Sequence, residues 1–223
     1  MIMLYGVFIT IIADEPKQNN TPTNFTESVI GPFTEFFGRY VSTNNITADR
    51  FKYLTPILIL LFILLYKIGD TMAHSLSTNF YLETGFTKTE IGSIVKFFGL
   101  FATLIGAFIG GLLSLKIGLY RSLIIFGIFQ AIATLGFAVL ASAGDNIYLL
   151  MIVVSLENLA AGMGYTAYLA FIANMTNRGF TATQFALMTA LMSLPRTLFS
   201  SYSGFLVEIL DWELYFIFCS LIA

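Results

Sequence analysis

The sequence predicts an all-α integral membrane protein, built as a bundle of transmembrane helices. Of its 223 residues, 57% are hydrophobic and only 11% are charged, and the mean hydropathy is +0.82. A water-soluble domain carries about 25% charged residues, so this composition argues against a soluble enzyme or a nucleic-acid-binding protein. The formal net charge of −2 gives no basic field that could hold a polyanion.

Five apolar stretches are long enough to form transmembrane helices, since about 20 helical residues cross a bilayer core. They are residues 53–73, 91–115, 122–141, 147–173 and 185–210. Two further runs, 1–12 and 212–223, are too short to cross alone. We therefore expect about five full transmembrane helices with a truncated helix at each end, as in a piece of a longer protein.

A polar linker, residues 13–52, separates the first run from the helical bundle of residues 53–223. Apolar residues recur near helical spacing from Phe25 to Phe37, which predicts a short amphipathic helix on the membrane surface. Cytoplasmic loops carry an excess of Lys and Arg. Alternate loops on the linker's side hold seven of these cations, whereas the opposite loops hold only Lys88. The linker is therefore expected in the cytoplasm.

Two helix starts are marked by a capping box, in which Ser or Thr precedes Glu or Gln by three residues. The two sequences are Thr87-Lys88-Thr89-Glu90 and Thr181-Ala182-Thr183-Gln184. Each stands just ahead of an apolar run, so we predict that a helix begins at each.

Metal, cofactor and enzymatic chemistry find little support in the sequence. Cys219 is the only cysteine and His74 is the only histidine, which excludes an internal disulfide and a cysteine or multi-histidine metal site. The sequence also lacks a nucleophile elbow and a phosphate-binding loop. We expect no metal, no cofactor and no enzymatic activity.

Ionisable residues interrupt the apolar stretches, and each costs about 2.5–3.5 kcal/mol to insert at mid-membrane. Lys67, Asp70 and His74 fall within about 60° of one another on a helix, so they form one polar stripe. Lys67 and Asp70 can pair directly, and mutual neutralisation could be their whole role. His74 fits a position at the helix end near the membrane interface.

Lys96 shares a helix face with Gly106-x-x-x-Gly110, a spacing that lets another backbone approach closely. That face is expected to point into the bundle and to bring Lys96 with it. Alternatively, the long Lys96 side chain could reach the lipid headgroups.

Three further candidate residues, Gln130, Glu157 and Asn158, lie inside the third and fourth apolar stretches. Gln130 could hold helices together or contact a ligand. Glu157 and Asn158 stand near mid-depth in the fourth stretch, and a buried glutamate can take up and release a proton. Glu157 is therefore a candidate proton carrier, although a salt bridge with a buried cation is an equal alternative.

Arg196 follows Pro195 in the fifth stretch, where proline is expected to bend the helix. An arginine at that depth must face protein or water, and its planar guanidinium suits a carboxylate or a phosphate. With Glu208 counted in the loop that follows the fifth stretch, cations inside the stretches outnumber anions by one: Lys67, Lys96 and Arg196 against Asp70 and Glu157. We therefore expect the bundle to favour an anionic solute.

Residues 111–121 resemble the loop G-x-L-x-D-R-x-G-R-R of the major facilitator superfamily. The matching residues are Gly111, Leu113, Lys116, Gly118 and Arg121, whereas Leu115 replaces the usual acid. Other segments are similar to the AmpG-type muropeptide permeases of that superfamily. These are Pro32 to Arg39, Tyr66-Lys67-Ile68-Gly69-Asp70, Glu157 to Gly164, and Ala182 to Leu187 followed by Arg196.

The resemblance implies one half of a facilitator-type bundle, running from the end of the sixth helix to the start of the twelfth. It implies proton-coupled import of anhydro-muropeptides across the bacterial inner membrane by alternating access, with an acetyl-coenzyme A-like anion as the alternative substrate. We expect substrate binding by Arg196, Lys96, Lys67, Asn158 and Gln130, and proton coupling by Glu157 and Asp70. All of these except Gln130 fall at positions that match the family's motifs. The expected partners are the lipid bilayer, protons and an anionic solute, with no nucleic acid. A hypothesis of another class is a non-transporting fragment or accessory subunit that needs a separately encoded amino-terminal half.

Overall fold

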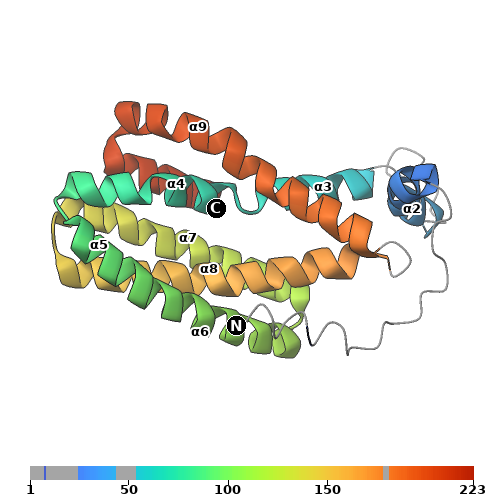
Figure 1. Cartoon of the computed structure of the whole chain (residues 1–223), viewed down its shortest axis with the longest axis horizontal. Coiled ribbons are helices and arrows are strands. Elements are labelled where there is room, and N and C mark those ends of the chain that lie inside the picture. The colour runs from blue at the N-terminus through green and yellow to red at the C-terminus, as the bar shows by residue number, and fades with distance from the viewer. Residues whose placement is uncertain (1–7, 9–24, 44–53, 178–180) are drawn as a thin grey trace.

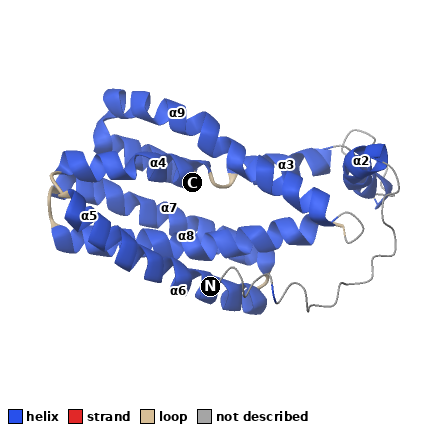
Figure 2. Ribbon diagram, viewed as in Figure 1, coloured by secondary structure: helices blue, strands red, loops and turns tan. Residues whose placement is uncertain are grey.

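The computed structural model consists of helices that pack side by side (Figure 1), and every element in the described part is helical (Figure 2). It describes residue 8 and residues 25–43, 54–177 and 181–223. Four of the described segments are long and apolar enough to cross a membrane: Leu54–Thr84, Lys88–Ile117, Leu119–Ala143 and Ile147–Met175. The predicted all-α bundle is confirmed. The predicted apolar run 1–12 lies outside the described residues, apart from Phe8.

The first crossing differs from the single helix predicted over residues 53–73. It consists of α3 (Leu54–Leu65) and α4 (Ile68–Thr84), which are separated by a turn at Tyr66 and Lys67. Lys67 has φ −114° and ψ 13°, outside the helical region. Helix α4 then continues eleven residues beyond the predicted end at residue 73, because polar side chains do not stop a helix, and it ends at Gly85 with φ 111°.

The second crossing is a series of three elements, α5 (Lys88–Ile94), the π-helical turn η1 (Val95–Gly99) and α6 (Leu100–Ile117). The predicted capping box at its start is confirmed. The Glu90 backbone N–H donates to the Thr87 hydroxyl at 3.3 Å, and the Glu90 carboxylate accepts from the Thr87 N–H at 2.8 Å. Because η1 adds backbone without a full α-helical turn, it changes which side chains share a face along this crossing.

The third and fourth crossings, α7 (Leu119–Ala143) and α8 (Ile147–Met175), match the predicted stretches 122–141 and 147–173 closely. A tight turn at Gly118, with φ 87°, joins α6 to α7, and a side chain would strain this backbone conformation. Asn146 begins α8 by accepting the N–H groups of Tyr148 and Leu149.

Helix α9 (Thr181–Ile222) contains the fifth predicted stretch and the last apolar run. It is not among the four described segments that are long and apolar enough to cross a membrane. The helix continues through Pro195, and its backbone leaves the helical region at Asp211 instead, with φ 60°. After Asp211 the chain turns back, and Tyr215 donates to the Met72 carbonyl of α4 at 2.7 Å.

The predicted helix of the linker is present as α2 (Phe25–Thr43). Phe36 is buried against the bundle, whereas Ile30 and Phe33 are exposed. Its position on a membrane surface stays a prediction. Figure 1 shows α2 at the same end of the bundle as the start of α3 and the start of α9, with the turn between α4 and α5 at the opposite end. Helix α2 and the turn that precedes Lys88 thus lie at opposite ends of the bundle.

Two apolar clusters form the core, and a polar layer separates them. One cluster includes Phe80, Phe137 and Phe216, and the other includes Phe126 and Tyr168. Along α7 and α8 the buried residues between these clusters include three polar side chains, Gln130, Thr134 and Glu157. The charged groups inside the bundle are therefore enclosed by apolar packing above and below.

Candidate functional site: a buried charged cluster

The break between α3 and α4 places a lysine and an aspartate side by side. Lys67 precedes the first turn of α4, and Asp70 lies within that turn, where the positive end of the helix dipole favours an anion. The Lys67 ammonium donates to Asp70 Oδ2 at 2.7 Å, and both residues are buried. Gly164 faces the ammonium, since a Cβ there would lie 3.9 Å from Lys67 Nζ. The predicted pairing is confirmed.

Gln130 of α7 connects this ion pair to α8. Its Nε2 donates to Asp70 Oδ1 at 3.0 Å and to Glu157 Oε1 at 2.8 Å. The Thr134 hydroxyl lies 3.3 Å from the same oxygen of Glu157. Glu157 and Thr134 are fully buried, and Gln130 is 4% exposed. Two carboxylates from different helices are thus held by one amide group, deep in the bundle.

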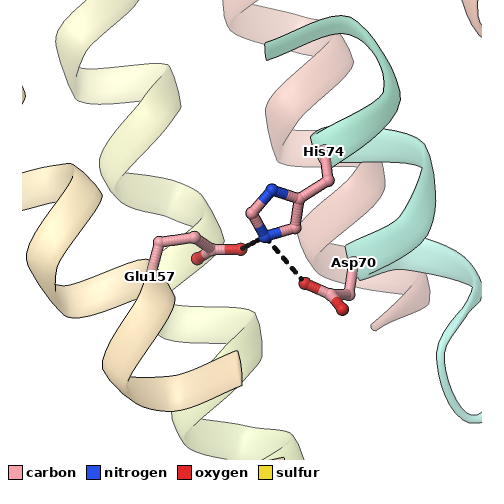
Figure 3. A group of neighbouring side chains, drawn as sticks. All are labelled: Asp70, His74 and Glu157. Carbon is pink, nitrogen blue, oxygen red and sulfur yellow. Dashed lines mark ion pairs between the residues drawn. The ribbon is translucent and has the colours of Figure 1, made fainter. Parts of the chain in front are cut away.

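His74 faces both carboxylates from the next turn of α4 (Figure 3). Its Nε2 lies 3.5 Å from Asp70 Oδ1 and 3.8 Å from Glu157 Oε1. The His74 side chain is 39% exposed, in contrast to the buried carboxylates. Sequence reasoning gave His74 little weight because it fitted a helix end, but the longer α4 places it well inside the crossing.

The charges of this cluster do not balance without a proton. Among the side chains that the structure describes, it holds two carboxylates, Asp70 and Glu157, and one permanent cation, Lys67. An uncompensated buried charge is costly, so a proton on Glu157, Asp70 or His74 would neutralise the layer. Among these described side chains the cation excess expected from the sequence is not present, because Lys96 does not join the cluster.

Asp70, His74 and Glu157 each offer one atom, and these atoms lie within 4.8 Å of one another, a spacing that a metal ion could use. The facing oxygens of Asp70 and Glu157 already accept the Gln130 N–H groups, and Lys67 covers the other Asp70 oxygen. A metal ion would have to displace these donors. The arrangement fits better with proton exchange among groups that are already hydrogen-bonded.

Lys96 lies apart from the cluster, contrary to the expectation that its helix face points inward. Gly99, Gly106 and Gly110 do face α8, but Lys96 is exposed. It belongs to the π-helical turn η1, which rotates the side chain away from the glycine face.

The Asn158 side chain connects α8 to α6 and is not part of the cluster around Glu157. Its side-chain oxygen accepts the Thr103 hydroxyl at 3.2 Å, and its amide donates to the Val154 carbonyl at 2.8 Å. Asn158 is half-buried, so part of it stays accessible.

The loop that resembles the facilitator motif forms the turn between α6 and α7. Gly118 takes the positive φ of this turn, Gly111 lies within α6, and Lys116 and Arg121 are exposed. Leu115, at the position of the usual acid, is 86% exposed. The turn geometry is thus present, without the acidic partner.

Sequence reasoning missed Thr134, although its spacing of four from Gln130 on one helix was a usable signal. It also missed a polar contact between the linker and the bundle. Glu35 of α2 accepts from Arg39 at 2.7 Å and from Gln184 at 2.7 Å, and it also accepts from Asn177.

This contact changes the interpretation of the second capping box. The Gln184 side chain also donates to the Pro32 carbonyl and accepts the Asn177 N–H, so it fastens α2 to the turn between α8 and α9. The Thr181 side chain lies outside the described residues, and the second capping box stays a prediction.

Burial raises the pKa of Glu35, but hydrogen bonds from Arg39, Asn177 and Gln184 and the charge of Arg39 outweigh it. The net result is a pKa below the ordinary value of 4.5. Glu35 is therefore ionised at neutral pH, and its negative charge is part of the contact.

Comparisons with known proteins agree with this architecture. Residues 58–223 match the profile of the Major Facilitator Superfamily. The chain is 36% identical over 219 residues to the anhydromuropeptide permease of Escherichia coli K12. This match covers 97% of the chain and 42% of that protein. It is 35% identical over 201 residues to AmpG 4 of Rickettsia conorii, covering 90% of the chain and 45% of that protein. An uncharacterized protein of Haemophilus influenzae is 34% identical over 233 residues, and the match covers 100% of the chain and 52% of that protein. The chain spans about half the length of these relatives.

Proposed function

The chain belongs to the major facilitator superfamily, and from this premise we propose that it forms the carboxy-terminal half of a proton-coupled permease for anhydro-muropeptides. This superfamily consists of transporters rather than enzymes, and the apolar helices fit a multi-pass protein of the inner membrane. The substrate class is proposed because the anhydromuropeptide permease of Escherichia coli is 36% identical over nearly the whole chain.

One observation carries the proposed mechanism: two buried carboxylates, Asp70 and Glu157, share one amide donor while one lysine faces them. Ionisable groups inside a membrane bundle are costly and commonly serve ion or substrate pathways. In this arrangement a proton bound by Glu157 or Asp70 neutralises the layer, and its release restores a net negative charge. This change of charge could favour one orientation of an alternating-access cycle over the other.

Substrate binding is proposed for Lys96, Asn158 and Arg196. Lys96 is exposed, Asn158 is half-buried, and Arg196 lies on α9. A muropeptide carries carboxylates, which lysine and arginine can bind. Lys67 and Gln130 already donate to Asp70 and Glu157, so we assign them an indirect role through these carboxylates.

The linker side is proposed to be cytoplasmic, since cytoplasmic loops carry an excess of Lys and Arg and α2 lies at the end of the bundle opposite the turn that precedes Lys88 (Figure 1). The turn at Gly118, with Lys116 and Arg121, would then face the cytoplasm. In facilitator folds the two halves rock around a site at mid-depth. We propose that the polar layer between the two apolar clusters lies at this depth in the membrane.

Uptake of labelled anhydro-muropeptide into proteoliposomes tests this proposal, with the chain paired to the amino-terminal half of a relative. Arg196→Ala, Lys96→Ala and Glu157→Gln should each reduce uptake strongly. Lys88→Ala, which removes an exposed cation at the start of the crossing that contains Lys96, should not reduce it. Unlabelled acetyl-coenzyme A is added as a competitor, and stronger competition than by unlabelled muropeptide would overturn the substrate class. Unchanged uptake by both Arg196→Ala and Glu157→Gln would overturn the site.

A second candidate is a chain that does not transport unless it is paired with another half. It is favoured because the chain spans about half the length of its relatives. Proteoliposomes with the chain alone should then take up no labelled muropeptide, and co-expression with an amino-terminal half should restore uptake. Uptake by the chain alone would exclude this candidate.

A further inference from the structure

The cluster contains one side chain that reaches from the accessible surface to the buried carboxylates. Glu157 is fully buried, and Asp70 and Gln130 are nearly so. The His74 side chain is 39% exposed, and its Nε2 lies 3.5 Å from Asp70 Oδ1 and 3.8 Å from Glu157 Oε1. In Figure 3 the other ring nitrogen, Nδ1, lies away from both carboxylates. The imidazole therefore has one nitrogen toward the buried anions and one that can face water.

The distances from His74 Nε2 to the two carboxylates allow the ring to move toward either of them. Lys67, Gln130 and Thr134 hold the carboxylates at hydrogen-bond distances of 2.7–3.3 Å. The His74 contacts are longer than a normal hydrogen bond, and a displacement of about 1 Å brings Nε2 to hydrogen-bond distance of one oxygen or the other. A small rotation of the ring could therefore select Asp70 or Glu157.

We propose that His74 is the residue through which protons reach Glu157 and Asp70. The proposal rests on the function proposed above. Water delivers a proton to Nδ1, and the proton on Nε2 passes to Glu157 Oε1, so the ring returns to its neutral form with the proton on Nδ1. Rotation of the ring or exchange with water then restores the proton on Nε2. Each cycle moves one proton and forms no covalent intermediate.

The groups around His74 are suited to this role. Among the described side chains, the charged groups that face it are Asp70 on its own helix and Glu157 on α8, with Lys67 on the far side of Asp70. The amide of Gln130 on α7 faces the same two carboxylates but cannot titrate. Histidine is the side chain that exchanges protons most readily near neutral pH.

The single histidine of the chain makes its protonation directly observable. The whole chain is labelled with ¹⁵N-histidine, reconstituted in nanodiscs and studied by NMR between pH 5 and 8, without any need for transport. We expect His74 to carry its proton on Nε2, and we expect its ¹⁵N signals to be displaced in Glu157→Gln and in Asp70→Asn, whereas Glu208→Gln, at an exposed position of α9, leaves them in place. Signals that are the same in wild type, Glu157→Gln and Asp70→Asn would overturn the proposal.

A transport measurement separates proton delivery from a structural role. His74→Gln keeps a polar side chain of similar size but cannot relay a proton. In the paired permease we expect it to lower proton-driven uptake about 100-fold, while exchange of labelled for unlabelled muropeptide, which needs no net proton movement, stays near the wild-type rate. Thr78→Ala, at an exposed position one turn further along α4, is the control and should leave both rates unchanged.

The outcomes distinguish the two proposals. Proton-driven uptake retained by His74→Gln, or exchange lost together with uptake, would overturn the role of His74. Absence of muropeptide transport by the wild-type paired permease would overturn the proposed function instead, and the NMR comparison would still decide whether His74 contacts the carboxylates.

Discussion

Gly106 of α6 lies directly against the backbone of Leu159 in α8. A Cβ atom on Gly106 would lie 2.2 Å from the Leu159 carbonyl oxygen, closer than any real contact. Gly162 of α8 makes the reciprocal approach, since its Cβ would lie 2.4 Å from the Thr103 carbonyl oxygen. The two crossings therefore meet backbone to backbone, which sets the position of Glu157 and Asn158 on α8 relative to α6.

Gly106→Ala is expected to destabilise the bundle because backbone atoms cannot move aside as a flexible side chain can. We expect a cost of about 1–3 kcal/mol from overpacking, seen as a lower midpoint of thermal unfolding in detergent. Gly92→Ala is the matched control in the same crossing, because a Cβ there meets no atom within 4 Å. Equal midpoints for the two variants would show that the helices do not meet as described.

Lys67→Met is expected to destabilise the protein strongly because it leaves Asp70 and Glu157 buried without a permanent cation. Removing one partner of a buried ion pair costs about 3–5 kcal/mol. Asp70→Asn should also be destabilising because it leaves the buried Lys67 without its anionic partner. The double variant Lys67→Met with Asp70→Asn should cost less than the sum of the single variants. Chemical unfolding of all four proteins measures this coupling, and strict additivity would contradict the pair.

Glu35→Gln is expected to loosen α2 from the turn between α8 and α9, because the carboxylate accepts from Arg39, Asn177 and Gln184. Trypsin cleavage after Arg39 should be faster in this variant at neutral pH. Glu208→Gln, at an exposed position of α9, is the control.

The same contact should depend on pH in a defined direction. The pKa of Glu35 is lowered from 4.5 in the folded protein, so its stabilising contribution is complete above 4.5 and is lost as the pH falls through the lower folded value. Hydrogen exchange of α2, corrected for the intrinsic rate at each pH, should therefore rise toward pH 3 in the wild type. In Glu35→Gln it should be high throughout, and a wild-type protein with unchanged protection at pH 3 would contradict the role of Glu35.

The sequence predicted those features that depend on local signals. The crossings α7 and α8 follow uninterrupted apolar stretches, the Thr87 capping box is a short-range motif, and Lys67 with Asp70 are three residues apart. The resemblance to the facilitator family added the order of the helices, which periodicity alone does not give.

Features that depend on tertiary packing were not predictable in this way. The break at Lys67 and the backbone turn at Asp211 carry no Gly or Pro at the position itself, so no local rule marks them. The contact of Gln130 with Asp70 and Glu157 requires the relative rotation of three helices. Lys96 was expected on the glycine face because a regular helix was assumed, and the π-helical turn altered that register.

The central claim is that the buried layer around Glu157 takes up the proton that drives uptake. It is tested most directly by loading proteoliposomes of the paired permease with a pH-sensitive dye and adding anhydro-muropeptide outside. The wild type should acidify the lumen as substrate enters, and Glu157→Gln should abolish this acidification, whereas the exposed control Glu208→Gln should acidify as the wild type does. Acidification by Glu157→Gln at the wild-type rate would contradict the account.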